Sequence, residues 1–122
     1  MRIGRDEQGQ AVVELALILP VVVVFVVAVL QVAVVARDQL AIEYVAREAA
    51  RAAAVSADPR GAASAAAHRV TSLSPIDVSV SVAGEMVRVR VRYVNVTDVA
   101  LVGVAIGDVT LEATAAMAWE PP

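Results

Sequence analysis

One acidic side chain, that of Glu14, lies inside an apolar stretch that begins at Ala11. A charge at the centre of a bilayer costs roughly 2.5–3.5 kcal/mol, and less near an interface. Glu14 therefore either lies at the headgroup level or meets a cation on a neighbouring subunit. If the chain were cut after Gly9, Gln10 would carry a new ammonium group about one helical turn from Glu14. Two such charges attract each other far more strongly in a low dielectric than in water.

The other residues with reactive side chains do not form a catalytic set. His68 is the single histidine, and Ser64 lies one helical turn before it. A serine and a histidine need an orienting acid and an oxyanion hole to act as a nucleophile pair. The sequence has no cysteine and no phosphate-loop or paired-histidine motif. We therefore expect no enzymatic activity, no cofactor, no metal site and no small-molecule substrate.

The composition points to a membrane. Hydrophobic residues make up 59% of the 122 positions, against about 45–50% in a typical soluble domain. Aromatic residues make up 3% and the net charge is −3, which argues against nucleic-acid binding. Residues 15–36 carry no charge and could span about 33 Å as a helix, enough for a bilayer core of about 30 Å. We predict a transmembrane helix here, with a kink at Pro20.

The same segment has two other interpretations. It could be the core helix of a soluble protein, but it is apolar on every face and the rest of the chain is too small to cover it. It could be a signal peptide cleaved after Ala36, but such apolar regions usually run about 7–15 residues. The arginines on either side do not decide the orientation, because both flanks carry them.

The helical pattern continues beyond the apolar segment, and we predict one helix over residues 10–57. Glu43 and Arg47, and Glu48 and Arg51, have the spacing of helical ion pairs. An apolar-to-small stripe is formed by Leu40, Ala41, Tyr44, Val45, Ala49, Ala52 and Ser56. Small residues allow close packing on a sister helix or on a sheet, although they are also simple helix formers. The positions concerned are Ala46, Ala49, Ala50 and Ala53.

A second helix and a sheet should follow. Asp58 can cap a helix that starts at Pro59 and ends near Val70, before Pro75. From Ile76 the apolar residues alternate with a period of two, which predicts a hairpin around Gly84 and a last strand over residues 109–119. A loop or short helical turn is expected at 95–107, marked by Asn95, Asp98, Gly103 and Gly107. The fold class is α+β, with a small antiparallel three-stranded sheet.

Three arginines share one face of the second strand: Arg88, Arg90 and Arg92. They invite a role in binding an acidic surface. We favour the simpler interpretation, a solvated face or cross-strand pairs with Glu85 and Glu112.

Residues 9–20, with Gly9, Glu14 and Pro20 at the start of a long apolar helix, resemble a type IV pilin-like leader. Together with residues 37–40 and 46–51, they are similar to the TadE-like family of tight-adherence (Flp-type) pilus proteins. The resemblance extends over about residues 8–57.

The resemblance implies that a prepilin peptidase cleaves between Gly9 and Gln10 and that Glu14 aids subunit docking. The protein would be a minor pilin or pseudopilin that contacts other pilin subunits and the assembly machinery. Its N-terminus would be cytoplasmic and its C-terminal part outside a single-pass membrane anchor. Major pilins of this system carry tyrosine where this chain has Leu15, which favours a minor component. The nine-residue leader has no net side-chain charge, so cleavage itself stays open.

The predicted organisation has four parts: a leader at 1–9, a transmembrane helix at 10–36, an extramembrane helical segment at 37–73 and a β-rich head at 74–122. The alternative is a secreted or single-pass envelope binding domain that is not part of a pilus.

Overall fold

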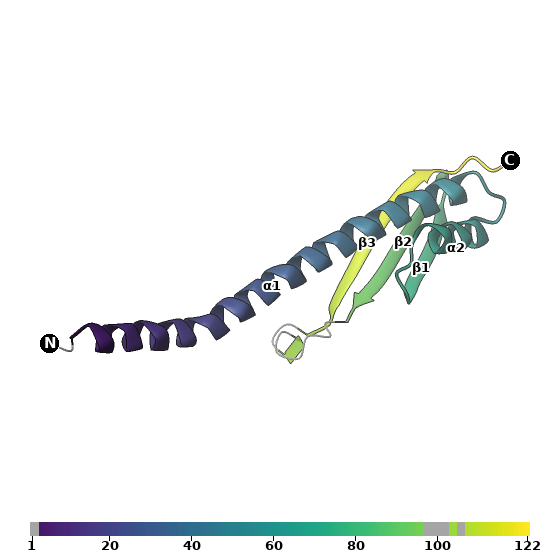
Figure 1. Ribbon diagram of the computed structural model, residues 1–122. Coiled ribbons are helices and arrows are strands. Elements are labelled where there is room, and N and C mark those ends of the chain that lie inside the picture. The colour runs from purple at the N-terminus through teal and green to yellow at the C-terminus, as the bar shows by residue number, and fades with distance from the viewer. Residues whose placement is uncertain (1–2, 97–102, 105–106) are drawn as a thin grey trace. The chain divides into compact units, whose positions relative to one another are not determined.

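The computed structural model describes residues 3–96, 103–104 and 107–122 (Figure 1). The chain divides into two compact units, Met1–Ala33 and Val34–Pro122. Two helices and three antiparallel strands follow one another in the order α1, α2, β1, β2, β3. This confirms the predicted α+β class. The boundaries predicted at residues 9, 36 and 73 stay predictions.

Helix α1 covers Ile3–Ala54, so it begins before and ends slightly before the limits predicted for it. Pro20 lies inside it. Its last turn carries Arg51, which interacts favourably with the negative end of the helix dipole. The ion pairs predicted on its surface are present, with 3.7 Å between the charged atoms of Glu43 and Arg47 and of Glu48 and Arg51.

Helix α2 covers Pro59–Val70 and starts as the sequence predicts. The backbone N–H of Gly61 donates a hydrogen bond of 3.2 Å to Oδ1 of Asp58, and Pro59 occupies the first turn. The helix ends because Thr71 is extended.

The sheet contains β1 (Ile76–Ala83), β2 (Met86–Asn95) and β3 (Val109–Ala118), with β2 in the centre. Gly84 has φ of +59°, a conformation that side chains disfavour, and it forms the predicted hairpin turn. The register pairs Val78 with Val91, and Val89 with Ala115, so the apolar side chains of the three strands share one face.

The expectation of irregular structure from residue 95 was wrong at its first residue. Asn95 belongs to β2 and pairs with Val109. It stays in the strand because its side chain is held in the core, as described below. The N–H of Gly107 donates 2.9 Å to the carbonyl of Gly103. Asp98, and with it residues 97–102 and 105–106, lies outside the described residues.

The core of the second unit forms where the helices meet the inner face of the sheet. Ile42 and Val45 of α1 and Val87, Val89 and Val91 of β2 are its largest fully buried side chains. Alanines of α1 and α2 belong to the same buried cluster and fill the space around these side chains. Of the two packing partners considered for the α1 alanines, the described structure uses the sheet: Ala46, Ala49, Ala50 and Ala53 are at most 1% exposed.

The stripe predicted on α1 was partly wrong. Val45 and Ala49 are buried, but Leu40 and Tyr44 are 68% and 54% exposed. The sheet covers the neighbouring face, which carries Asp38 and Ile42 and continues through the alanines named above. The predicted stripe combined positions from two adjacent faces of the helix, and only one of them meets the sheet.

Candidate functional site

The residues assigned to processing and docking all lie on α1 in the first unit. Gly9, Gln10, Glu14 and Pro20 are exposed to their surroundings. Gln10 and Glu14 are separated by about one helical turn. Glu14 makes no hydrogen bond or ion pair within the described part of the chain. Its carboxylate is therefore available to a group outside this protomer.

Gly9 is not required by the protomer's own packing. It lies in α1, and a Cβ built at this position would meet no atom within 4 Å. Alanine or leucine favours a helix over glycine by about 0.8–1.0 kcal/mol. The described structure therefore gives no packing reason for glycine at this position.

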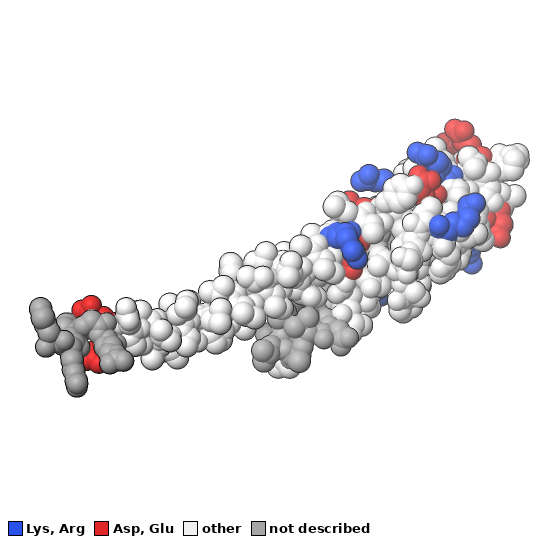
Figure 2. Space-filling model, in the orientation of Figure 1, with Lys and Arg blue, Asp and Glu red and all other residues white. Residues whose placement is uncertain are grey.

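The first unit presents an apolar surface that needs a non-aqueous partner. Its large hydrophobic side chains from Val12 to Val32 are mostly 46–69% exposed. Figure 2 shows that charged atoms on the visible face gather near the N-terminus and on the second unit. Helix α1 holds one stretch long and apolar enough to cross a membrane, and none of that stretch is buried in the protein. A surface of this kind is expected to contact lipid or other apolar helices.

A buried polar pair joins α1 to the sheet. The Nδ2 of Asn95 donates a 2.6 Å hydrogen bond to Oδ2 of Asp38, and the two residues are 5% and 3% exposed. Arg37 donates to the other carboxylate oxygen at 3.3 Å. Sequence reasoning missed this pair. A signal was present, because Asp38 lies on the same face of the helix as Ile42 and Val45.

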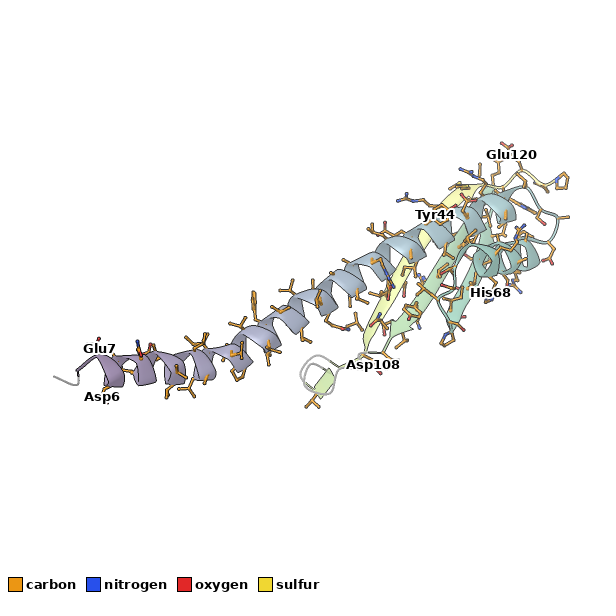
Figure 3. The ribbon with its side chains drawn as sticks, in the orientation of Figure 1. Asp6, Glu7, Tyr44, His68, Asp108 and Glu120 are labelled. Atoms are coloured by element: carbon orange, nitrogen blue, oxygen red, sulfur yellow. The ribbon has the colours of Figure 1, made fainter. Side chains whose placement is uncertain are left out.

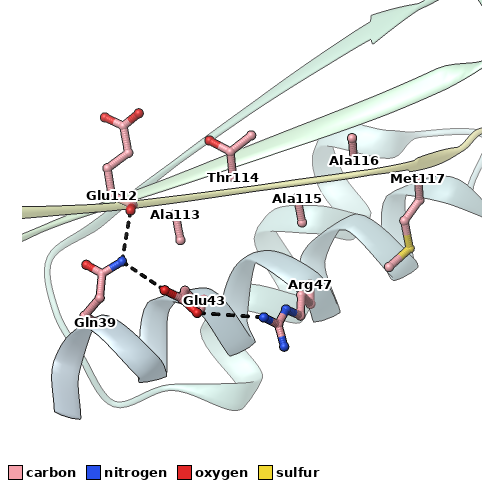
Figure 4. Close-up of a pocket in the computed structure, with 9 residues that line it drawn as sticks. All are labelled: Gln39, Glu43, Arg47, Glu112, Ala113, Thr114, Ala115, Ala116 and Met117. Carbon is pink, nitrogen blue, oxygen red and sulfur yellow. Dashed lines mark hydrogen bonds and ion pairs between the residues drawn. The ribbon is translucent and has the colours of Figure 1, made fainter. Parts of the chain in front are cut away.

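A groove of about 440 Å³ runs between α1 and the free edge of β3 (Figure 4). Gln39 spans it, donating 3.3 Å to the backbone carbonyl of Glu112 and 3.3 Å to the carboxylate of Glu43. Arg47 also lines the α1 side of the groove and forms an ion pair with Glu43. The facing strand segment contributes three small side chains to the groove, namely Ala113, Ala115 and Ala116. The groove can hold polar groups by hydrogen bonds, and it was not predicted.

The arginine row of β2 lies on the outer face of the sheet. Glu112 pairs with Arg90 at 3.1 Å and with Arg92 at 3.3 Å. These cross-strand pairs confirm the simpler interpretation for two of the three arginines. Glu85 forms no ion pair with them among the described residues, and neither does any acid with Arg88.

His68 is an exposed residue on α2, and Figure 3 labels it together with Tyr44 on α1. Ser64 is partly buried on the same helix. No hydrogen bond joins the two side chains within the described residues.

Comparison with known proteins identifies part of α1. Residues 9–51 match the protein family described as TadE-like protein. This segment is TadE-like. Searches among curated proteins and among solved structures returned no match.

The TadE-like segment begins at Gly9 and contains Glu14, Pro20 and most of the buried face of α1. It confirms the resemblance drawn from the sequence. The match associates the protein with the tight-adherence pilus, and the apolar helix gives it a candidate membrane anchor. The sheet lies outside the matched residues.

Proposed function

We propose that this protein is a minor pilin or pseudopilin of a tight-adherence pilus. The observation that carries the proposal is the TadE-like match, which starts at Gly9 and runs along α1 through Glu14. The second unit would serve as a folded head with its own core. The proposal includes no enzymatic step, cofactor or nucleic acid.

Processing follows from the same segment. A prepilin peptidase would cleave between Gly9 and Gln10, and it would leave an ammonium group near Glu14. The N-terminus would be cytoplasmic before cleavage, and the head would lie outside the membrane. The exposed apolar surface of α1 supports insertion in the bilayer and later packing against other pilin subunits.

Glu14 supports a docking role because it has no hydrogen-bond or ion-pair partner among the described residues of its own protomer. A neighbouring subunit shifted by about one turn along the helix axis could bring its Gln10 ammonium group to this carboxylate. An ion pair formed away from water would select one axial register between subunits.

A second candidate is a secreted or singly anchored envelope domain outside a pilus. Val34–Pro122 forms a compact unit with a continuous core, and this favours a head able to fold without the first unit. That head would be released by cleavage after Ala36 or held by an uncleaved anchor.

The experiment that tests the proposal is intact-mass analysis and N-terminal sequencing of the protein purified from its native host. A chain that starts at Gln10 supports prepilin-type processing. A start at Arg37 contradicts it and leaves the secreted domain. A start at Met1 contradicts prepilin-type processing and favours the uncleaved envelope anchor.

A further inference from the structure

The outer face of the sheet carries an uneven distribution of charge. Arg88, Arg90 and Arg92 alternate with buried valines along β2, so their side chains project from the same face. Two acids share that face: Asp77 lies opposite Arg92 on β1, and Glu112 lies opposite Arg92 on β3. Both acids are thus at one end of the arginine row.

At the other end of the row, neither cross-strand neighbour of Arg88 is an acid. The cross-strand neighbours of Arg88 are Ser81 on β1 and Ala116 on β3. Among the described residues, no carboxylate forms an ion pair with Arg88. Its guanidinium group therefore keeps its donors for a ligand from outside the protomer.

Glu112 shows how a carboxylate fits between two arginines of this row. One of its oxygens lies 3.1 Å from Nε of Arg90, and the other lies 3.3 Å from a terminal nitrogen of Arg92. The contact at Arg90 uses Nε, so the terminal nitrogens of Arg90 remain for a second acceptor. A carboxylate from outside could bridge Arg88 and Arg90 in the same manner.

A shallow hollow of about 230 Å³ lies at this end of the row, lined by Ser79, Val80, Ser81, Arg88 and Arg90. Ser79 lies directly opposite Arg90, as Ser81 does opposite Arg88. The hydroxyl of Ser79 donates 3.5 Å to the backbone carbonyl of Arg90. The hydroxyl of Ser81 adds a hydrogen-bond donor beside the guanidinium groups. Planar guanidinium donors with a hydroxyl at their side suit an oxygen anion.

We propose that Arg88 and Arg90, with the hydroxyl of Ser81, bind a carboxylate side chain in an acidic segment of a partner protein. The three arginines exceed the two acids of this face by only one charge, so a broad anionic surface gains little from it. A single carboxylate gains more, because it can occupy the Arg88 end and avoid both acids. The site is independent of the role in a pilus.

The test uses the full-length chain in an uncharged detergent and a rhodamine-labelled hexaglutamate peptide. Fluorescence anisotropy measures its binding, with hexaglutamine as the uncharged probe. Arg88→Gln should weaken hexaglutamate binding by about threefold or more. Arg60→Gln is the matched control, because Arg60 is exposed on α2 and the change in net charge is the same. It should leave binding unchanged.

Glu112→Gln gives a prediction of the opposite sign. It frees Arg90 and Arg92 from their internal acid, so hexaglutamate should bind more tightly than it does to the parent chain.

Three results would overturn the proposal: equal weakening by the Arg88 and Arg60 substitutions, no gain from Glu112→Gln, or no difference between hexaglutamate and hexaglutamine.

Two further experiments distinguish other sources of an anion. Displacement of the peptide by inorganic phosphate at the same carboxylate-equivalent concentration would assign the site to free oxyanions. Loss of binding to phosphatidylglycerol vesicles on Arg88→Gln would assign it to lipid headgroups. Either result contradicts a protein partner.

Discussion

Asn95 at the end of β2 donates a 2.6 Å hydrogen bond to Asp38 on α1, across 57 positions of sequence. A carboxylate only accepts hydrogen bonds, so the amide nitrogen of Asn95, and not its oxygen, must face Asp38. The amide oxygen is left buried without a hydrogen-bond partner among the described residues. The pair fixes how the end of β2 lies against α1, because both side chains would be costly to bury alone.

The first prediction concerns this pair. Asn95→Ala should lower the free energy of unfolding by about 1–3 kcal/mol, because it leaves the buried carboxylate with one donor fewer. Denaturant unfolding of the full-length chain in detergent micelles measures the change. Thr114→Ala, on the exposed face of β3, should alter stability by less than about 0.5 kcal/mol. Equal stability of the two variants would show that the pair contributes nothing.

A second prediction concerns the start of α2. A Cβ at Gly61 would contact the carboxylate of Asp58, which caps the helix. Gly61→Ala should therefore displace the cap, and losing a cap costs about 1 kcal/mol. In an Asp58→Ala background the same change should instead stabilise the protein by about 0.4–1 kcal/mol, because alanine restricts the unfolded chain. The four unfolding curves form a double-mutant cycle, and additivity would contradict the proposed collision.

The α+β order of this protein could be predicted because its local signals agree. The cap at Asp58, the turn at Gly84 and the alternation of valines along β2 each specify local structure, and none conflicts with another. The cross-strand role of Glu112 also followed from the alternation, because it places charged residues on one face.

Contacts between elements could not be predicted in the same way. The choice of the α1 face that meets the sheet depends on how the helix lies across the strands, and Leu40 and Val45 are equally apolar in sequence. The sequence pattern predicted that Asn95 lies in a loop, because asparagine favours turns. Its buried partner lies 57 positions earlier, so no local signal indicated the contact. The groove beside β3 depends on the same docking.

The small buried side chains of α1 give a third prediction. Ala49 is fully buried in the core. Ala49→Leu should lower the free energy of unfolding by about 1–3 kcal/mol, because the added atoms force the strands and the helix apart. Ala65→Leu is the matched control, since Ala65 is exposed on α2 and leucine is also a good helix former. Thermal unfolding compares the two, and a stable Ala49→Leu variant would mean that the core has room for leucine.

Processing of the leader gives a fourth prediction. Gly9→Leu should leave α1 intact, because leucine favours a helix and no described atom lies within 4 Å of a Cβ at this position. If a peptidase requires glycine before the cut, the variant should accumulate as the uncleaved chain. Intact-mass analysis from the native host measures the ratio of the two forms. If parent and variant showed the same cleaved mass, the peptidase would not require glycine at this position, and that part of the proposal would be wrong.

The last prediction separates the docking role of Glu14 from its position in the membrane. Glu14→Gln keeps the size of the side chain and removes its charge, so insertion should be unaffected or easier. If Glu14 pairs with the ammonium group of a neighbouring subunit, losing a charged hydrogen bond of about 1.5–3 kcal/mol should reduce incorporation into pili by about tenfold or more. Quantitative immunoblotting of sheared pili and of membranes measures the assembled and the inserted amounts.

Glu7→Gln is the matched control, because Glu7 lies in the predicted leader and should be absent from the assembled subunit. Equal incorporation of the two variants would leave Glu14 as an ordinary headgroup-level acid, whereas equal loss would point to a general effect of charge before assembly.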